Sequence, residues 1–138
     1  TMNINIDFVN KLRNSGLRPT KQRLKICEVL FNTKKTFHFT VNDLSKIISE
    51  KLNQKISLAT IYNTVHAFKK KGYLKEISMN SDKTYFDTNT THHHHFFDSS
   101  TMKLIDLSDD QVEKIKINKA LPGKKISSVE ILVKVENE

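Results

Sequence analysis

Residues 57–74 read SLATIYNTVHAFKKKGYL, and this stretch decides the fold. Ser57 is a favoured helix N-cap and Gly72 a favoured helix stop, so the stretch predicts one helix between them. Its apolar face has the spacing of a core-facing stripe and consists of Leu58, Ile61, Val65 and Phe68. The opposite face is polar and carries Ala59, Tyr62, Asn63, His66, Lys69 and Lys70. Such a face is typical of the recognition helix of a helix-turn-helix, although an ordinary amphipathic surface helix shares the same periodicity.

The distribution of charge favours the DNA-binding alternative. The 138-residue chain has a formal net charge of +8 and is 37% hydrophobic. Residues 1–76 hold 15 Lys and Arg against 5 Asp and Glu, a net of +10, whereas residues 77–138 hold 8 against 10, a net of −2. A basic half around a polar helix face indicates a polyanionic partner such as nucleic acid.

Further helices are expected over residues 5–14, from Thr20 onward and after Thr40. Their inward residues should be Ile6, Val9 and Leu12, then Leu24, Cys27, Leu30 and Phe31, then Val41, Leu44, Ile48 and Leu52. His38 lies in the loop before the third of these helices. After Gly72, YLKEISMN and KTYFD flank a polar Asn80-Ser81-Asp82 turn and predict a β-hairpin. Residues 1–86 therefore predict a winged-helix DNA-binding domain.

Residues 87–138 predict a small α/β domain for sensing and dimerisation, which makes the whole chain α+β. HHHHFF and MKLIDL should be strands, and Ser108 to Gln111 resembles a capping box before a helix with Val112, Ile115 and Leu121 inward. Pro122-Gly123 breaks the chain, and ISSVEILVKV alternates as a strand does. About 50 residues make a small core, so we expect a homodimer, whose two-fold symmetry suits a pseudo-palindromic operator.

Four of the six histidines form the run His92–His95, between Asp87 and Asp106. In a strand, alternation places His93 and His95 on one face and His92 and His94 on the other. Imidazoles with carboxylates are ligands for zinc, iron or manganese, and imidazole also binds haem iron. An expression tag or solvated loop is the alternative, but the run is internal and two phenylalanines follow it.

Cys27 is the one cysteine of the chain, so a structural zinc held by four cysteines of one chain is excluded. Its helical spacing predicts a small buried side chain. We find no apolar run of membrane-spanning length and no signal peptide in the sequence, so we expect a cytoplasmic protein without a membrane partner.

LRPTKQRLKI, SLATIYNTVHAFKKKGYL and TYFDTNTTHHHHFF, in this order and spacing, resemble the ferric uptake regulator family. The resemblance runs from about Gly16 to Val135. YFDTNTTHHHHFF, together with the lack of Cys-x-x-Cys pairs, resembles the iron response regulator branch of alphaproteobacteria. The family resemblance implies a regulatory Fe²⁺, Mn²⁺ or Zn²⁺ site at His38, Asp87, His93, His95 and Asp106.

The resemblance also implies a second metal or haem site at His92, His94 and Glu113. The last ligand of that site in the family falls at Val129, so the site is incomplete. The DNA contacts that it implies, on an A·T-rich operator, are Arg18, Arg23, Ser57, Thr60, Tyr62, Asn63 and Lys69. The branch resemblance implies a metal- or haem-responsive regulator of iron uptake and haem synthesis genes, bound to DNA when iron is scarce.

Three alternatives remain open. A peroxide-sensing Fe- or Mn-dependent repressor of the same family would use the same ligands. A metallohydrolase would need an open metal position and a general base, whereas the carboxylates here are already assigned as ligands. A metal buffer would bind ions without affecting DNA.

Overall fold

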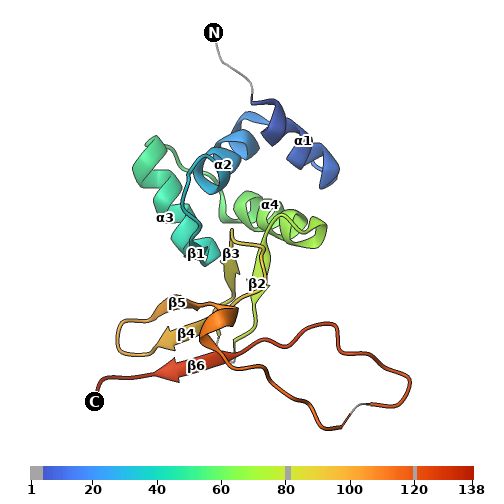
Figure 1. Cartoon of the computed structure of the whole chain (residues 1–138). Coiled ribbons are helices and arrows are strands. Elements are labelled where there is room, and N and C mark those ends of the chain that lie inside the picture. Colours follow the sequence, from blue (N-terminus) through green and yellow to red (C-terminus); the bar gives the residue numbers. More distant parts are fainter. Residues whose placement is uncertain (1–4, 80–81, 120) are drawn as a thin grey trace. The chain divides into compact units, whose positions relative to one another are not determined.

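A computed structural model describes residues 5–79, 82–119 and 121–138 (Figure 1). The chain separates into two compact units, residues 1–90 and 91–138, and each is described by itself. Among the described residues, the longest helix has 14 residues, and none is long and apolar enough to cross a membrane.

The first unit is a helical domain with a small sheet, labelled in Figure 1. Its elements are α1 (Ile6–Asn14), α2 (Lys21–Phe31), β1 (His38–Phe39), α3 (Val41–Leu52), α4 (Leu58–Lys71), β2 (Lys75–Ile77) and β3 (Tyr85–Asp87). The expected caps start the helices: the side chains of Thr20 and Ser57 accept hydrogen bonds from the backbone N–H groups three residues on. Thr40 and Asp43 form a reciprocal capping box at α3. Gly72 ends α4 in the left-handed conformation (φ 94°).

The helices of the first unit enclose one apolar core. Its fully buried side chains come from each helix and from strands β1 and β3, and they include Leu12, Ile26, Leu30, Phe39, Leu44, Ile48, Ile61, Val65, Phe68 and Phe86. Two residues that we expected to face inward do not. Ile6 is 66% exposed and Leu58 is 51% exposed, because each is the first residue of its helix and that turn is not covered.

A three-stranded antiparallel sheet in the order β1-β3-β2 completes this winged-helix unit. The β2–β3 pairing confirms the predicted hairpin, whereas Asn80 and Ser81 of its expected turn lie outside the described residues. We expected His38 in a loop. Instead it lies in β1, where His38 is opposite Asp87 and Phe39 is opposite Phe86 on β3.

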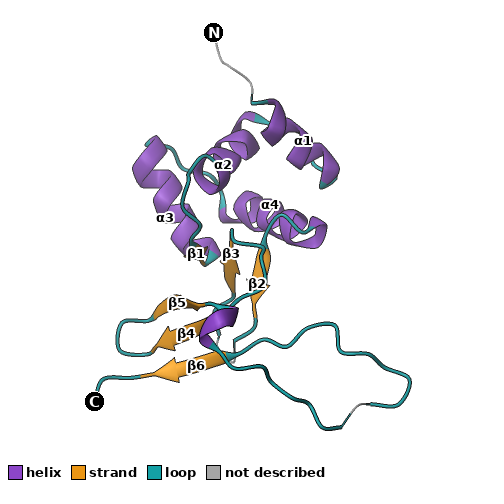
Figure 2. Cartoon of the chain, viewed as in Figure 1, coloured by secondary structure: helices purple, strands orange, loops and turns teal. Residues whose placement is uncertain are grey.

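The second unit is a three-stranded sheet in the order β5-β4-β6. Strand β4 (His94–Asp98) pairs antiparallel with β5 (Lys103–Leu107) and parallel with β6 (Leu132–Val135). A single 3₁₀ turn, η1 (Asp109–Gln111), follows β5. The described residues between η1 and β6 lead away from the sheet as a long loop (Figure 2).

Two predictions for this unit are wrong in detail. The helix expected after Ser108 is limited to η1, and Ile115 and Leu121 are 42% and 72% exposed. Ile115 and Ile117 alternate with lysines, which favours extended chain over helix. The last strand covers Leu132–Val135 alone, because its partner β4 has only five residues. The α+β class with an N-terminal winged helix is confirmed.

Candidate metal centre and nucleic-acid interface

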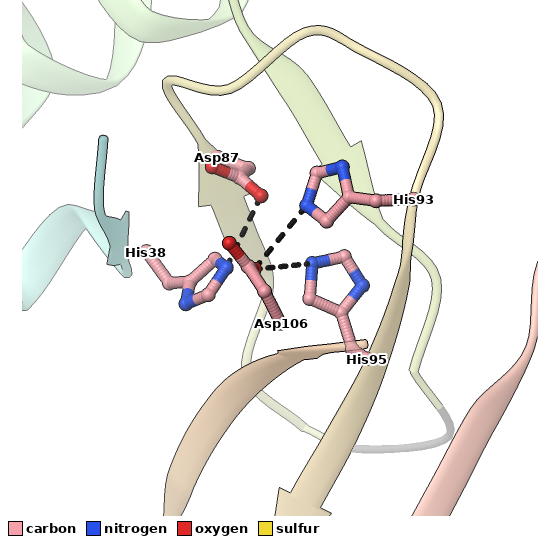
Figure 3. A group of neighbouring side chains, drawn as sticks. All are labelled: His38, Asp87, His93, His95 and Asp106. Carbon is pink, nitrogen blue, oxygen red and sulfur yellow. Dashed lines mark ion pairs between the residues drawn. The ribbon is translucent and has the colours of Figure 1, made fainter. Parts of the chain in front are cut away.

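In the first unit, the partly buried imidazole of His38 pairs with the buried carboxylate of Asp87. Their Cα atoms are partners across β1 and β3, and His38 Nε2 lies 3.1 Å from Asp87 Oδ2 (Figure 3). The other carboxylate oxygen accepts a hydrogen bond from the Asn89 backbone N–H at 2.8 Å. The backbone of Asn89 thus fixes one oxygen of the Asp87 carboxylate, and the other oxygen, Oδ2, faces the His38 imidazole.

In the second unit, His93 and His95 are turned toward the same carboxylate. His93 Nε2 lies 3.3 Å and His95 Nε2 lies 3.6 Å from Asp106 Oδ1, and the two imidazole rings are 4.5 Å apart (Figure 3). His95 and Asp106 are direct partners across β4 and β5. Strand alternation predicted the pairing of His93 with His95, and the structure confirms that they share a face.

The tautomer of His93 suits a metal ligand. Its Nδ1 lies 2.7 Å from the Thr91 carbonyl oxygen, which can only accept, so Nδ1 carries the proton of the neutral ring. The lone pair is then on Nε2, on the side of Asp106. A ligating histidine that donates its other N–H to a backbone carbonyl is the usual arrangement around protein-bound metals.

His92 and His94 gather around Asp109 instead. Asp109 Oδ2 lies 3.0 Å from His92 Nδ1, and Asp109 Oδ1 lies 2.8 Å from His94 Nε2. The hydrogen bond from His92 is the main reason that the pKa of Asp109 is lowered. Glu113, which we expected as the carboxylate, lines a cavity of about 370 Å³ beside both histidines with Val129. No spacing rule in the sequence indicated Asp109.

The hydrogen bonds of this second cluster differ from those of His93. The Ile131 backbone N–H donates to His94 Nδ1 at 3.0 Å, so the neutral His94 ring carries its proton on Nε2, toward Asp109. His92 Nε2 lies 3.0 Å from the Val129 carbonyl oxygen. A metal on His94 Nε2 would have to displace that proton and disturb the hydrogen bond from the Ile131 N–H. The three side chains of His92, His94 and Asp109 therefore form a hydrogen-bonded cluster that is less suited to a metal than the one around His93.

The polar face of α4 places the expected DNA-reading side chains in solvent. Tyr62 is 51% exposed and Asn63 is exposed as well. At the helix N-terminus, Ser57 Oγ lies 2.8 Å from Thr60 Oγ1, so both hydroxyls sit at the end of the helix that favours anions. These features are what a recognition helix requires.

The basic residues expected to contact DNA have defined positions. Arg18 lies just before α2 and Arg23 lies in its first turn. Arg23 Nη1 donates a hydrogen bond to the Arg18 carbonyl oxygen at 3.1 Å, so the two residues are in direct contact. Lys69 Nζ lies 3.3 Å from Glu76 Oε2, a half-exposed ion pair that solvent weakens. Arg18 is exposed and Arg23 is partly buried.

Cys27 is buried in the core, as predicted, and burial raises the pKa of its thiol to about 12. Such a thiol stays protonated at neutral pH and is neither a metal ligand nor a nucleophile.

A winged helix with a polar recognition helix defines a transcription regulator, and clustered histidines and carboxylates define one that binds metals. The profile of the ferric uptake regulator family matches residues 14–134, and the chain belongs to this family. Members of the family are dimeric, metal-binding, DNA-binding transcription regulators and not enzymes.

Curated relatives include a peroxide-responsive repressor and a ferric uptake regulation protein. The chain is 32% identical over 109 residues to a peroxide-responsive repressor of Staphylococcus epidermidis, covering 79% of this chain and 71% of the relative. It is 33% identical over 105 residues to the ferric uptake regulation protein of Yersinia pestis, covering 75% and 70%.

Solved structures support the fold. The ferric uptake regulator of Vibrio cholerae superposes with a TM-score of 0.69 at 22% identity, covering 94% of this chain and 98% of that one. The ferric uptake regulator of Pseudomonas aeruginosa, solved with manganese, gives 0.67 at 19% identity, covering 95% and 98%.

Proposed function

We propose that the chain is a metal-responsive, DNA-binding regulator that binds one divalent ion through His38, Asp87, His93, His95 and Asp106. The observation that carries the proposal is the placement of the His93 ring: Nδ1 lies 2.7 Å from the Thr91 carbonyl oxygen, and Nε2 lies 3.3 Å from Asp106 Oδ1. His95 offers a second imidazole beside Asp106, and the His38–Asp87 pair offers a third imidazole and a second carboxylate.

The proposed ligands form two groups, a first half-site of His38 and Asp87 and a second half-site of His93, His95 and Asp106. The short chain segment between them allows both half-sites to bind the same ion. Asp87 and His93 are six residues apart, so the extended chain separates their Cα atoms by at most about 20 Å. An ion that takes ligands from both units would fix the angle between them. In a dimer, that angle would set the spacing of the two recognition helices.

The donor set fits a borderline divalent ion. Three neutral imidazoles and two carboxylates suit Fe²⁺, Mn²⁺ or Zn²⁺, whereas an alkaline-earth ion prefers oxygen ligands alone. When bound, the ion would supply positive charge that neutralises Asp87 and Asp106.

Stoichiometry and affinity separate a shared site from two independent ones. Titrating the full chain with Mn²⁺ in a calorimeter should reveal one tight site per chain at the five proposed ligands. Asp87→Asn and His95→Ala should each weaken that same site. If the half-sites bound separately, each substitution would remove one site and leave the other at its original affinity.

The proposed DNA interface is α4 with the N-terminus of α2. Tyr62 can contact thymine methyl groups and Asn63 can pair with adenine, while Arg18 suits a narrow A·T-rich minor groove. Arg23, Ser57, Thr60 and Lys69 would contact phosphates and fix the register. A palindromic operator bound by a homodimer follows from the family and stays a prediction for this chain.

Selection from random DNA identifies the operator. Duplexes bound by the chain are selected from a random pool, once without metal and once with Mn²⁺. Gel shifts at fixed salt then compare the apo chain with Fe²⁺, Mn²⁺ and haem. An ion-dependent change in affinity for a selected duplex supports the proposal, and metal binding with no change in DNA affinity would instead indicate a metal buffer.

A peroxide sensor is the second candidate, favoured by the likeness to the Staphylococcus epidermidis repressor. Fe²⁺ at the proposed site would then react with peroxide and oxidise a ligand histidine. Mass spectrometry of the Fe²⁺ form after peroxide treatment decides this, since oxygen added to His38 or His93 supports the sensor and an unmodified chain argues against it.

Control of iron uptake and haem synthesis genes, with DNA bound when iron is scarce, is also part of the proposal. Its support is the resemblance of the His92–His95 run to the iron response regulator branch. A bare ion is favoured over haem as the effector, because His92 and His94 are engaged with Asp109 and with the backbone at Val129 and Ile131. Haem-induced loss of DNA binding, retained after His93 and His95 are replaced, would reverse that preference.

A further inference from the structure

Two aromatic contacts connect the exposed face of α4 to the small sheet of the same unit. The Tyr62 and His66 rings lie 4.1 Å apart, one helical turn from each other. The His66 ring also meets Phe86 of β3 edge to face, with centroids 5.7 Å apart and an interplanar angle of 80°. His66 therefore touches a DNA-facing ring on one side and a core ring on the other.

Phe86 belongs to the strand pair that carries the first half-site. It is 1% exposed and lies opposite Phe39, with the two rings 5.8 Å apart. The next pair along the same two strands is His38 and Asp87. An ion that pulls on His38 and Asp87 thus acts on the residues directly beside Phe39 and Phe86. Because protein cores are close-packed, a displacement of Phe86 is passed on to the ring it touches.

We propose that His66 is a positioning residue that couples metal binding at His38 and Asp87 to the orientation of Tyr62 on α4. The inference rests on the proposed function, since it needs both a metal effect and a DNA-binding face. It adds a residue that is neither a metal ligand nor a base-reading side chain.

The alternative is that His66 has a structural role alone and packs on its neighbours without transmitting metal binding to Tyr62. The two alternatives differ in one measurable quantity. The coupling factor is the ratio of DNA affinities with and without metal, and linkage requires that DNA change the metal affinity by the same ratio. A packing residue alters the individual affinities or the stability, whereas a coupling residue alters this ratio.

The structure allows His66 to be replaced without loss of the fold. Helix α4 is fixed in the core by Ile61, Val65 and Phe68, each 0% exposed, while His66 is only partly buried. His66→Phe keeps a planar ring against Tyr62 and Phe86. His66→Ala and His66→Leu remove the ring, and both are good helix formers.

The experiment measures the coupling factor from both directions. The full chain and its variants bind a duplex selected from a random pool by the wild-type protein, with and without Mn²⁺, and they bind Mn²⁺ with and without that duplex. Wild type should give a factor of about 5 to 150 in either sense. His66→Ala and His66→Leu should bring it to within about twofold of one, and His66→Phe should keep it. Glu50→Ala on the exposed face of α3 is the control and should keep it as well.

Each outcome bears on the inference. If His66→Ala and His66→Leu, shown to be folded by circular dichroism, keep the wild-type factor, His66 is a packing residue and the inference is wrong. If His66→Phe loses the factor as His66→Leu does, the ring contacts do not carry the coupling. A wild-type factor of one would mean that the proposed function itself fails, which is a different result from a variant that departs from a coupled wild type.

Discussion

His38 and Asp87 face each other across β1 and β3, with His38 Nε2 3.1 Å from Asp87 Oδ2. The carboxylate is 1% exposed, so an ion bound there would meet an anionic oxygen that water does not screen. We predict that Asp87→Asn weakens Mn²⁺ binding at least about tenfold, because even a residue that only hydrogen-bonds to a metal ligand typically contributes about that much to affinity. Isothermal titration calorimetry measures the effect.

Asp98→Asn is the matched control for that substitution. The Asp98 carboxylate accepts a hydrogen bond from the Ser100 backbone N–H at 3.0 Å and belongs to neither histidine cluster. Its replacement should leave the Mn²⁺ affinity unchanged. Equal losses in both variants would indicate a general effect of charge rather than a ligand at Asp87.

The two histidine pairs should behave differently. Replacing His93 and His95 with Ala should abolish the metal response in gel shifts and leave metal-independent DNA binding largely intact. Replacing His92 and His94 should keep the response, because these rings bond to Asp109 and the backbone. A response that survives the first double substitution and disappears in the second would assign the effector to the Asp109 cluster.

Local signals predicted the first unit well and the second unit poorly. The ends of the helices were predicted correctly, because a cap and the helix that it bounds are neighbours in the sequence. The N-caps are Thr20, Thr40 and Ser57, and the C-cap is Gly72. The position of His38 in a strand depends on pairing with Asp87, 49 residues away, and a two-residue strand has no periodicity to detect.

The carboxylate at Asp109 was missed for a similar reason. Its contacts with His92 and His94 come from the turn η1 after β5. The capping box marks that turn in the sequence, but contacts with histidines more than a dozen residues away leave no local pattern. Glu113 was expected from resemblance alone. By contrast, strand alternation correctly separated His93 and His95 from their neighbours, because side-chain parity is a local property.

Tyr62→Ala should weaken binding to the selected duplex about tenfold, since losing a side chain that reads a base costs roughly 1–3 kcal/mol. The Mn²⁺ affinity without DNA should stay within about twofold of wild type, as Tyr62 is not among the five proposed ligands. Fluorescence anisotropy of a labelled duplex measures the first quantity and calorimetry the second. Unchanged DNA affinity would place the interface elsewhere than on α4.

The lowered pKa of Asp109 predicts a pH dependence of stability. Its pKa in the folded chain lies below the ordinary value of 3.8, mainly because His92 hydrogen-bonds to the carboxylate. The charged carboxylate therefore stabilises the fold above the unfolded-state pKa, and this stabilisation is lost as the pH falls through the lower folded-state value. In thermal melts, the difference between wild type and Asp109→Asn should shrink as the pH falls from 5 toward about 3. A constant difference across that range would contradict the assignment.

Cys27 should resist alkylation in the native chain. Its side chain is 0% exposed, and burial raises the pKa of the thiol from 9.0 to about 12. At pH 8 this lowers the thiolate fraction about a thousandfold, so iodoacetamide should react mainly through transient unfolding. Mass spectrometry of native and guanidine-denatured protein, sampled over time, measures the two rates. Rapid native labelling would show an accessible thiol, and oxygen added after peroxide treatment could then no longer be assigned to His38 or His93 without locating the modified residue.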